Sequence, residues 1–363
     1  MSNRLPHPDP LPPLFQEVAP NMAIPDPFAA PSLRWGILGA GGIARTFARD
    51  VPKYSKQQVV AIGSRELSRA QAFATEMGLQ QVGTYGSYEE LVQADDIDVI
   101  YIATPHMRHR DDALLALNAG KPVLVEKAFA TSIDQVNEVF DTAETTGLFA
   151  MEGMWSRHLP HYHFIRAAIA SGRLGRLVEV SADHGQRLTH IARMTDPNLA
   201  GGAMLDLGVY PISLVQMTLG KPTEQVALGR LSDLGVDLGD VVIGKHEGGL
   251  SVATCQMDGA TSMHAILTFE AGTIELTKNF YGPTKVRLTV FDLDPTTGAA
   301  VSARKQKWDA RVPGGFQYEA AEAAHRITAG DLESPVVPWS ATREVQEMMD
   351  DALAQVGVRY PRF

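Results

Sequence analysis

Three residues of this 363-residue chain could together move a proton at a carbonyl or hydroxyl group. Lys127 ends the apolar run VLVEK, and its ammonium could lower the pKa of a nearby hydroxyl and hold a substrate oxygen. Asp206 and Tyr210 are four residues apart in a helix-like stretch, so both point from one face. A tyrosine beside a lysine is a plausible proton donor to a carbonyl. Two alternatives stay open: a Glu126–Lys127 surface ion pair worth under about 1 kcal/mol, and a core tyrosine with its hydroxyl at the rim.

A glycine-rich turn near the start of the chain has the spacing of a dinucleotide site. Residues 33–44 read LRWGILGAGGIA, a short apolar strand that runs into the pattern G-x-G-x-x-G/A. Gly39 permits the tight turn, Gly41 lets the backbone approach a pyrophosphate, and the small Ala44 lets the following helix pack on the sheet. The phosphates would meet the positive end of that helix. Because glycine-rich turns are common, the motif alone is weak evidence for a nucleotide site. We assign Gly39, Gly41, Gly42 and Ile43 to the predicted cofactor site.

The end of the second expected strand indicates which dinucleotide is bound. An acidic residue there would bind the ribose hydroxyl of NAD, whereas an arginine accommodates the 2′-phosphate of NADP. Here the chain has Ser64 and Arg65, with Arg69 one turn further on, which favours NADP over NAD. Alternatively, both arginines are ordinary solvated residues at a helix start. Strand ends elsewhere in this region complete the predicted cofactor site with Thr104, Pro105, His109, Glu126 and Lys127.

Strand-like and helix-like segments alternate from Leu33 to Gly153, which predicts βαβ units that form a parallel sheet. The expected strands are residues 34–38, 58–62, 99–103, 123–125 and 148–151. Residues 67–77 and 110–119 are expected helices, and residues 83–90 are expected to form a loop that enters a helix capped near Ser87.

After Met154 the pattern changes to that of a large, mostly antiparallel open sheet. Its expected strands are residues 177–182, 225–231, 241–245, 250–257, 262–269, 272–276 and 285–291. Helices are expected at 162–170, 316–329 and 340–356. We therefore predict an α/β chain with a Rossmann domain at 33–153, onto which the last helix could pack, and a substrate-binding and oligomerisation domain at 154–363. A sheet face that few helices cover needs a partner, and a second copy is the simplest one.

The first 32 residues contain nine prolines and form an arm that cannot be a regular helix or a central strand. One possibility is a disordered tail. The other is an extended arm that lies across a neighbouring subunit, which costs less entropy because proline has less chain freedom to lose.

Composition limits the partners and the compartment. The net charge is −10 and no basic block occurs, so nucleic acid and anionic membranes are poor partners. No apolar run approaches the roughly 20 residues that cross a bilayer. The one cysteine, Cys255, excludes a disulfide within the chain and suggests a reducing, cytoplasmic location. His158, His161 and His163 lack the spacing of a known metal site, so we predict no metal.

Taken in order, these motifs resemble the glucose–fructose oxidoreductase / inositol dehydrogenase / MocA family. The branch with dimeric dihydrodiol dehydrogenase and NADP-dependent D-xylose dehydrogenase is the most similar. The resemblance covers nearly all of residues 33–361 and includes IGSR, ATPHMRH, AGKPVLVEKA, EGMWSRHLP and GGAMLDLGVYP. It implies that Lys127 is the lysine of an E-K-P motif, with Ala128 replacing the proline, which puts a cis geometry there in doubt. It also implies that Tyr210 is the acid/base residue, where many relatives have histidine, and that Asp206 is its partner carboxylate.

The resemblance implies an NADP(H)-dependent oxidoreductase that acts on a hydroxyl or carbonyl of a sugar or polyol. Trp155, Arg157 and His158 would line the substrate cleft together with Asp206 and Tyr210. A homodimer or homotetramer would form through the C-terminal sheet, with the arm on a neighbouring subunit. Two alternatives remain: a sugar–sugar oxidoreductase that retains NADP(H) through both half-reactions, and a non-catalytic NADP-sensing regulator.

Overall fold

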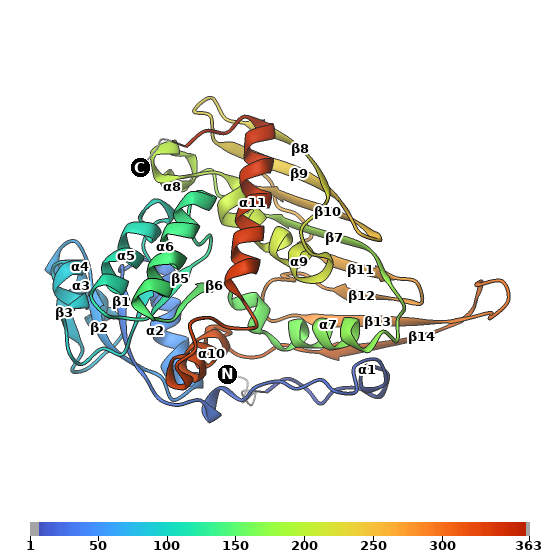
Figure 1. Ribbon diagram of the computed structural model, residues 1–363, viewed down its shortest axis with the longest axis horizontal. Coiled ribbons are helices and arrows are strands. Elements are labelled where there is room, and N and C mark those ends of the chain that lie inside the picture. The colour runs from blue at the N-terminus through green and yellow to red at the C-terminus, as the bar shows by residue number, and fades with distance from the viewer. Residues whose placement is uncertain (1–6, 361–363) are drawn as a thin grey trace. The chain divides into compact units, whose positions relative to one another are not determined.

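The computed structural model describes residues 7–360, which divide into two compact units (Figure 1). The parallel-sheet unit contains residues 25–155 and 314–346, and the antiparallel-sheet unit contains residues 7–24, 156–313 and 347–360. The first six residues of the predicted arm and the last three of the predicted C-terminal domain lie outside the described residues.

The parallel-sheet unit has the Rossmann strand order β3-β2-β1-β4-β5-β6, with all neighbours parallel. Its strands are β1 (Arg34–Leu38), β2 (Gln58–Gly63), β3 (Gly83–Tyr85), β4 (Val99–Ile102), β5 (Val123–Glu126) and β6 (Ala150–Gly153). Its helices are α2 (Gly42–Tyr54), α3 (Leu67–Glu76), α4 (Tyr88–Val92), α5 (His109–Asn118), α6 (Ile133–Thr146) and α10 (Phe316–Ala329). Strands β4, β5 and β6 are buried along their whole length, as expected of a sheet covered on both faces. The predicted fold of this region is confirmed.

Local capping explains where two of these helices begin. The Ser87 hydroxyl accepts a hydrogen bond from Glu90 N at 3.1 Å, so the predicted cap of α4 is confirmed. Ser132 caps α6 in the same way. Strand β3 was not predicted, because its three half-buried residues give no alternating apolar pattern.

The antiparallel-sheet unit contains eight strands in the order β14-β13-β12-β11-β7-β10-β9-β8. They are β7 (Leu177–Gly185), β8 (Glu224–Leu231), β9 (Asp237–His246), β10 (Gly249–Gln256), β11 (Ala265–Phe269), β12 (Gly272–Leu276), β13 (Lys285–Leu293) and β14 (Ala300–Asp309). Only β7 and β10 pair in parallel, so the predicted mostly antiparallel sheet is confirmed. Strand β14 was missed because its exposed, charged sequence AVSARKQKWD is that of an edge strand.

One face of this sheet is covered by helices and the other is open. Helices α7 (Pro160–Ser171) and α9 (Val209–Leu219) and the end of α11 (Trp339–Val356) lie on the covered face (Figure 1). On the open face, paired positions of β8, β9, β10, β7 and β11 form an apolar row. Four of its five positions are apolar, namely Val226, Ile243, Val252 and Ile266, and β7 contributes the polar Ser181; Leu228 and Val241 lie beside the row. Leu228 is 73% exposed, which is unusual for a leucine.

The first part of the proline-rich arm contains a helix, α1 (Pro13–Val18), and the prediction that excluded a helix was wrong there. Pro13 occupies the first helical position, where a missing N–H breaks no helical hydrogen bond. Phe15 is fully buried, with its ring centroid 4.8 Å from that of Phe164 and 5.9 Å from that of Trp308. The described arm therefore packs on its own chain and is not a disordered tail; a contact with a neighbouring subunit stays a prediction.

The second part of the arm belongs to the parallel-sheet unit. A 3₁₀ turn at Pro27–Ala29 is capped by Asp26 and precedes Ala30, which is buried against Ala321 and Ala324 of α10. Gln57 then ties the arm to the sheet by donating its side-chain N–H to the carbonyl of Pro31 at 2.7 Å.

Among the described residues, one helical stretch, Pro197–Leu219, is by length and composition apolar enough to cross a membrane, contrary to the sequence-based expectation. Of the most apolar part of this stretch, 83% is buried inside the protein, as in a core helix.

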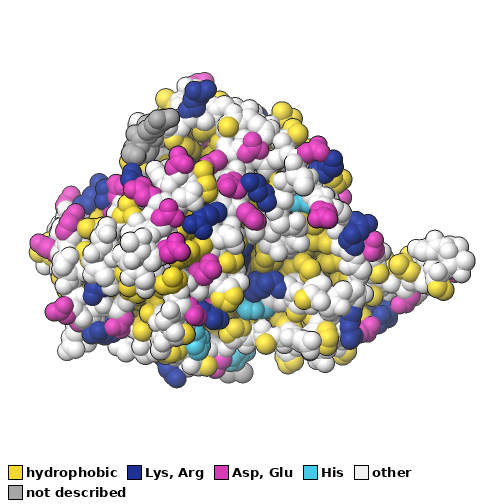
Figure 2. All heavy atoms as spheres, viewed as in Figure 1, with side chains coloured by type: hydrophobic (Ala, Val, Ile, Leu, Met, Phe, Trp, Pro, Cys, Tyr) yellow, Lys and Arg dark blue, Asp and Glu magenta, His cyan; other side chains and the backbone are white. Residues whose placement is uncertain are grey.

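On the face of the molecule drawn in Figure 2, basic and acidic side chains are interspersed.

Candidate active site

The glycine turn after β1 has the shape that a dinucleotide fingerprint requires. Gly39 has φ +105°, and a Cβ atom there would lie 2.7 Å from the carbonyl oxygen of Ala103. By contrast, a Cβ on Gly42 would meet nothing within 4 Å. Gly41 starts α2 without any side-chain cap, so the first N–H groups of this helix have no side-chain acceptor at the N-cap. The turn thus fits a pyrophosphate at the positive end of α2.

Arg65, Arg69 and Arg108 all act electrostatically on Tyr88, the first residue of α4, and Arg65 and Arg69 follow β2 at the predicted 2′-phosphate position. Burial raises the pKa of Tyr88, and the positive charges of Arg65, Arg108 and Arg69 act against that rise. Arg65 and Arg69 are exposed, while Ser64 is buried and donates its N–H to the carbonyl of Tyr85 at 3.2 Å. Arg108 was not assigned from the sequence, although it lies in the motif ATPHMRH.

The loop after β4 is fixed by a buried histidine. The two ring nitrogens of His109 lie 2.8 Å from the carbonyl oxygens of Thr104 and Ala128. Burial lowers the pKa of His109 to about 4, so the ring is neutral at pH 7. A neutral ring has one N–H, so His109 donates a hydrogen bond to one of these carbonyl groups and contacts the other, between the loops that follow β4 and β5. Its predicted contact with a cofactor, and that of Pro105, stay predictions.

Lys127 follows β5 and is half-buried, with a cis peptide bond to Ala128. The cis geometry is thus present although alanine replaces proline. The neighbouring Glu126 is buried and accepts a hydrogen bond from the Tyr101 hydroxyl, so it is not half of a simple surface pair.

Two further buried glutamates of the same unit were not found from the sequence. Glu152 of β6 accepts hydrogen bonds from Phe129 N at 3.3 Å and from Thr342 Oγ1 at 3.1 Å. Burial raises the pKa of Glu319 of α10 well above its usual range, and Glu126 and Glu152 raise it further. Both effects favour the protonated, uncharged form of Glu319.

Asp206 and Tyr210 lie at the start of the long helix of the antiparallel-sheet unit. Residues Met204–Gly208 form a π-helical turn that continues into α9, and such turns occur frequently at functional sites. Asp206 forms an ion pair with Arg193 at 3.3 Å, and its side chain is 13% exposed. Tyr210 is 7% exposed. Both predicted residues therefore belong to one short helical segment.

An aromatic cluster surrounds Tyr210. Its ring centroid lies 5.3 Å from that of His184 and 4.6 Å from that of Tyr281, and the latter two rings stack at 4.2 Å. Gln186 donates from Nε2 to the Tyr281 hydroxyl at 3.2 Å. His184 lies at the end of β7 and Gln186 just after it. The sequence analysis did not identify them, because the alternation of a half-buried strand does not distinguish functional residues from structural ones.

The three predicted substrate residues Trp155, Arg157 and His158 differ in their surroundings. Trp155 stacks on Phe316 in the parallel-sheet unit, with ring centroids 4.8 Å apart. In the antiparallel-sheet unit, the Arg157 guanidinium donates to Ser213 Oγ at 2.8 Å and to other atoms of α9. His158 is 2% exposed, and burial lowers its pKa well below the usual value. The contacts of Arg157 and His158 are those of packing residues, and a role of any of the three in substrate binding stays a prediction.

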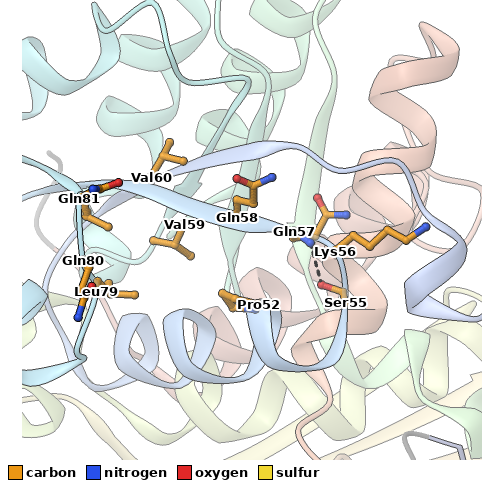
Figure 3. A pocket seen from close by; sticks show the side chains of 11 residues that line it. Pro52, Ser55, Lys56, Gln57, Gln58, Val59, Val60, Leu79, Gln80 and Gln81 are labelled. Carbon is orange, nitrogen blue, oxygen red and sulfur yellow. Dashed lines mark hydrogen bonds between the residues drawn. The ribbon is translucent and has the colours of Figure 1, made fainter.

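Two other features of the described residues bear on the site. No group of three or more His, Cys, Asp or Glu is placed to hold a metal ion within residues 7–360. A pocket opens beside the first residues of β2, lined by Pro52, Gln57, Gln58 and Gln81 among others (Figure 3). It adjoins the amino end of a parallel strand, whereas ligands of open α/β sheets bind at the carboxyl ends, so we do not assign the cofactor to it.

Two family descriptions match this chain. "Oxidoreductase family, NAD-binding Rossmann fold" matches residues 33–154, and "GFO/IDH/MocA C-terminal domain" matches residues 162–291. Trans-1,2-dihydrobenzene-1,2-diol dehydrogenase of Bos taurus is 35% identical over 341 residues, covering 91% of this chain and 99% of the relative. D-xylose 1-dehydrogenase (NADP(+)) of Hypocrea jecorina is 34% identical over 377 residues, covering 92% of this chain and 94% of the relative.

Solved structures share the fold at lower identity. A 3-ketoreductase from Actinomadura kijaniata, in complex with NADP and TDP-benzene, has a TM-score of 0.76 and 24% identity, covering 92% of this chain and all of the other. An aldose–aldose oxidoreductase from Caulobacter crescentus has a TM-score of 0.78 and 18% identity, covering 90% of this chain and 98% of the other.

The glycine turn can be tested by two matched substitutions. We expect Gly39→Ala to lower the free energy of unfolding by about 1–3 kcal/mol or more, because alanine at positive φ is strained and its Cβ meets the Ala103 carbonyl. Gly42→Ala, at an open helical position, should leave the stability unchanged. Urea unfolding measures both; equal stabilities of the two variants would contradict the described turn.

Proposed function

This chain belongs to the GFO/IDH/MocA oxidoreductase family, and on that premise we propose a specific reaction and a role for each site residue. The protein is an NADP(H)-dependent dehydrogenase or reductase that acts on CH–OH groups and transfers a hydride between the nicotinamide and a substrate carbon. Its substrate is a sugar or a polyol-like molecule. The observation that carries the proposal is the open, uncapped start of α2 behind the Gly39 turn, followed by Ser64 and Arg65 where NAD enzymes have an acid.

The nucleotide is proposed to bind along the carboxyl ends of the parallel strands. Backbone N–H groups at Gly41, Gly42 and Ile43 would hold the pyrophosphate. Arg65 and Arg69 would bind the 2′-phosphate, and Arg108 adds positive charge around Tyr88 nearby. When bound, NADP supplies or accepts the hydride. The protein supplies the alignment and the charge.

Proton transfer is assigned to Tyr210. When an alcohol is oxidised, the hydroxyl proton leaves to Tyr210, and in the reverse direction the tyrosine returns it to the carbonyl oxygen. Lys127 favours the ionised form of the tyrosine and orients the substrate oxygen. Asp206, which Arg193 holds in place, accepts a hydrogen bond from a substrate hydroxyl. The rings of His184 and Tyr281 limit the rotation of the Tyr210 ring.

A second candidate keeps NADP(H) bound while one sugar is oxidised and another is reduced. The proline-rich arm, whose described residues are folded, supports this candidate, because an arm laid over a bound cofactor would restrict its exchange. Denaturing the purified protein and assaying the supernatant separates the candidates: only the second predicts stoichiometric release of NADP(H). A cytoplasmic location is also proposed, supported by the single, buried cysteine.

Tyr210→Phe tests the proton-transfer assignment. We expect kcat to fall by about 10²–10⁴-fold, the usual contribution of a positioned general acid or base, with the fold and NADP affinity kept. Lys127→Met should also lower kcat strongly. A panel of sugars and polyols, monitored at the nicotinamide absorbance, gives the rates, and nucleotide titration gives the affinity. Near-normal turnover of Tyr210→Phe would refute the assignment.

The cofactor preference is tested by replacing both exposed arginines. In the Arg65→Ala/Arg69→Ala variant we expect kcat/KM with NADP to fall by about 10²–10⁴-fold, because two arginines are removed and charge-assisted hydrogen bonds contribute about 1.5–3 kcal/mol each. The value with NAD should change little. Arg287→Ala, an exposed arginine of β13, is the control. A wild-type preference for NAD would contradict our interpretation of Ser64 and Arg65.

The apolar row on the open sheet face supports a homodimer, or a tetramer built from such dimers. Substituting Leu228→Glu and Ile243→Glu should shift the molar mass in analytical ultracentrifugation toward that of the monomer, because burying two charges in an apolar interface is costly. Ala303→Glu, at an exposed position on β14 outside the row, is the control. A double variant with the mass of the wild-type oligomer would exclude this face as the interface.

A further inference from the structure

The helical segment that carries Asp206 and Tyr210 is capped from a distant strand. No side chain of its own caps the π-helical turn, which follows Ala203 directly. Instead, Met204 N donates a 2.6 Å hydrogen bond to Oδ2 of Asp237, thirty-three residues further along the chain on β9. Asp237 is fully buried, so this bond is shielded from water.

A second buried carboxyl group, that of Asp240, supports Asp237. Asp240 is 3% exposed, and the two side chains lie within hydrogen-bonding range of each other. The Oδ1 atom of each has no other hydrogen-bond partner among the described residues. Burial and the neighbouring Asp240 carboxyl group raise the pKa of Asp237 well above its usual range, which favours one protonated carboxyl group in the pair. The other oxygen of Asp240 accepts a weak bond from the Cys255 thiol at 3.6 Å.

The backbone comes so close to the Asp237 and Asp240 carboxyl groups that two neighbouring positions have room only for glycine. A Cβ atom on Gly202 would overlap Oδ1 of Asp237, and one on Gly229 would overlap Oδ1 of Asp240. Next to Gly202, the Tyr360 hydroxyl donates a hydrogen bond to the carbonyl of Gly201 at 2.9 Å. This bond holds the backbone segment that leads into the helix. Gly202 therefore has a definite role: because it lacks a Cβ atom, Asp237 can reach Met204 N.

We propose that Asp237, supported by Asp240, is a positioning residue that fixes the first turn of the helix bearing Asp206 and Tyr210. This inference rests on the proposed function, because it presumes that these two side chains act on the substrate. Asp237 touches neither reactant in the proposal and acts only through the backbone at Met204. With one carboxyl group of the pair protonated, Asp237 accepts the hydrogen bond of Met204 N and the core does not hold two negative charges.

Three substitutions separate a positioning role from a general structural one. In Asp237→Asn, the amide oxygen can still accept from Met204 N and the amide nitrogen can donate to Asp240, so kcat should stay within about threefold of wild type. Asp237→Ala removes the acceptor and should lower kcat about 10–100-fold, the cost of a displacement of about 1 Å at a reacting group. NADP affinity should stay unchanged in both, because the proposed nucleotide residues belong to the other unit. Asp258→Ala, which removes an exposed ion pair with Arg230, is the control.

Hydrogen exchange of the amides of residues 203–210 gives a measurement that does not depend on activity. It should be at least about tenfold faster in Asp237→Ala and unchanged in Asp237→Asn, because only the first loses the cap. If Asp237→Ala does not fold, Asp237→Val, whose branched side chain is closer in size to aspartate and has no acceptor, replaces it in both assays. An inactive wild-type protein would refute the proposed function, whereas the exchange result would still decide whether Asp237 caps the helix.

Two results would overturn the inference. One is that the variants without an acceptor at position 237 keep the kcat and the hydrogen exchange of the wild type. The other is an Asp237→Asn variant as impaired as Asp237→Ala, which would show that a full negative charge is needed and that no proton is shared.

Discussion

The positive end of a helix needs negative charge or hydrogen-bond acceptors, and this protein meets that need in two different ways. Helix α2 starts at Gly41 with no side chain over its N–H groups, beside a turn in which only glycine fits at position 39. The helix of Asp206 and Tyr210 is closed by Asp237, a buried side chain of its own unit. The first arrangement leaves a place for an anionic ligand, and the second removes freedom from the residues that are proposed to react.

The sheet of each unit determines what can be built on it. In the parallel sheet the strand order reverses between β1 and β4, so connections leave in opposite directions and a crevice forms at the carboxyl ends. Gly39, Ser64, Thr104 and Lys127 all follow such strand ends. In the antiparallel sheet, helices cover one face while the other presents an apolar row across five strands. This second face has no catalytic residue of the proposal and is available for association.

Buried carboxyl groups are the chemistry that both units share. Glu126 and Glu152 raise the pKa of the buried Glu319, and Asp240 raises that of the buried Asp237. In each case desolvation favours the uncharged acid, and a neighbouring carboxyl group strengthens the effect. Glu126 of the first group precedes Lys127 in the sequence, and Asp237 of the second group is bonded to the turn that carries Asp206. Stability and the placement of reactive groups therefore depend on the same interactions.

The sequence by itself determined the fold class, the family and the residues at the strand ends, because these depend on local patterns. The turn at residues 39–44, the cap at Ser87 and the four-residue spacing of Asp206 and Tyr210 are all set by neighbours in the chain. It missed β14, whose exposed charges hide its strand character, and α1, whose prolines precede the helix or occupy its first position, where they break no helical hydrogen bond. Only the tertiary structure showed that Arg157 is bonded to α9, that His184 and Tyr281 enclose Tyr210, and that Asp237 caps a helix thirty-three residues away. Such contacts join residues with no fixed spacing, so no periodicity or motif records them.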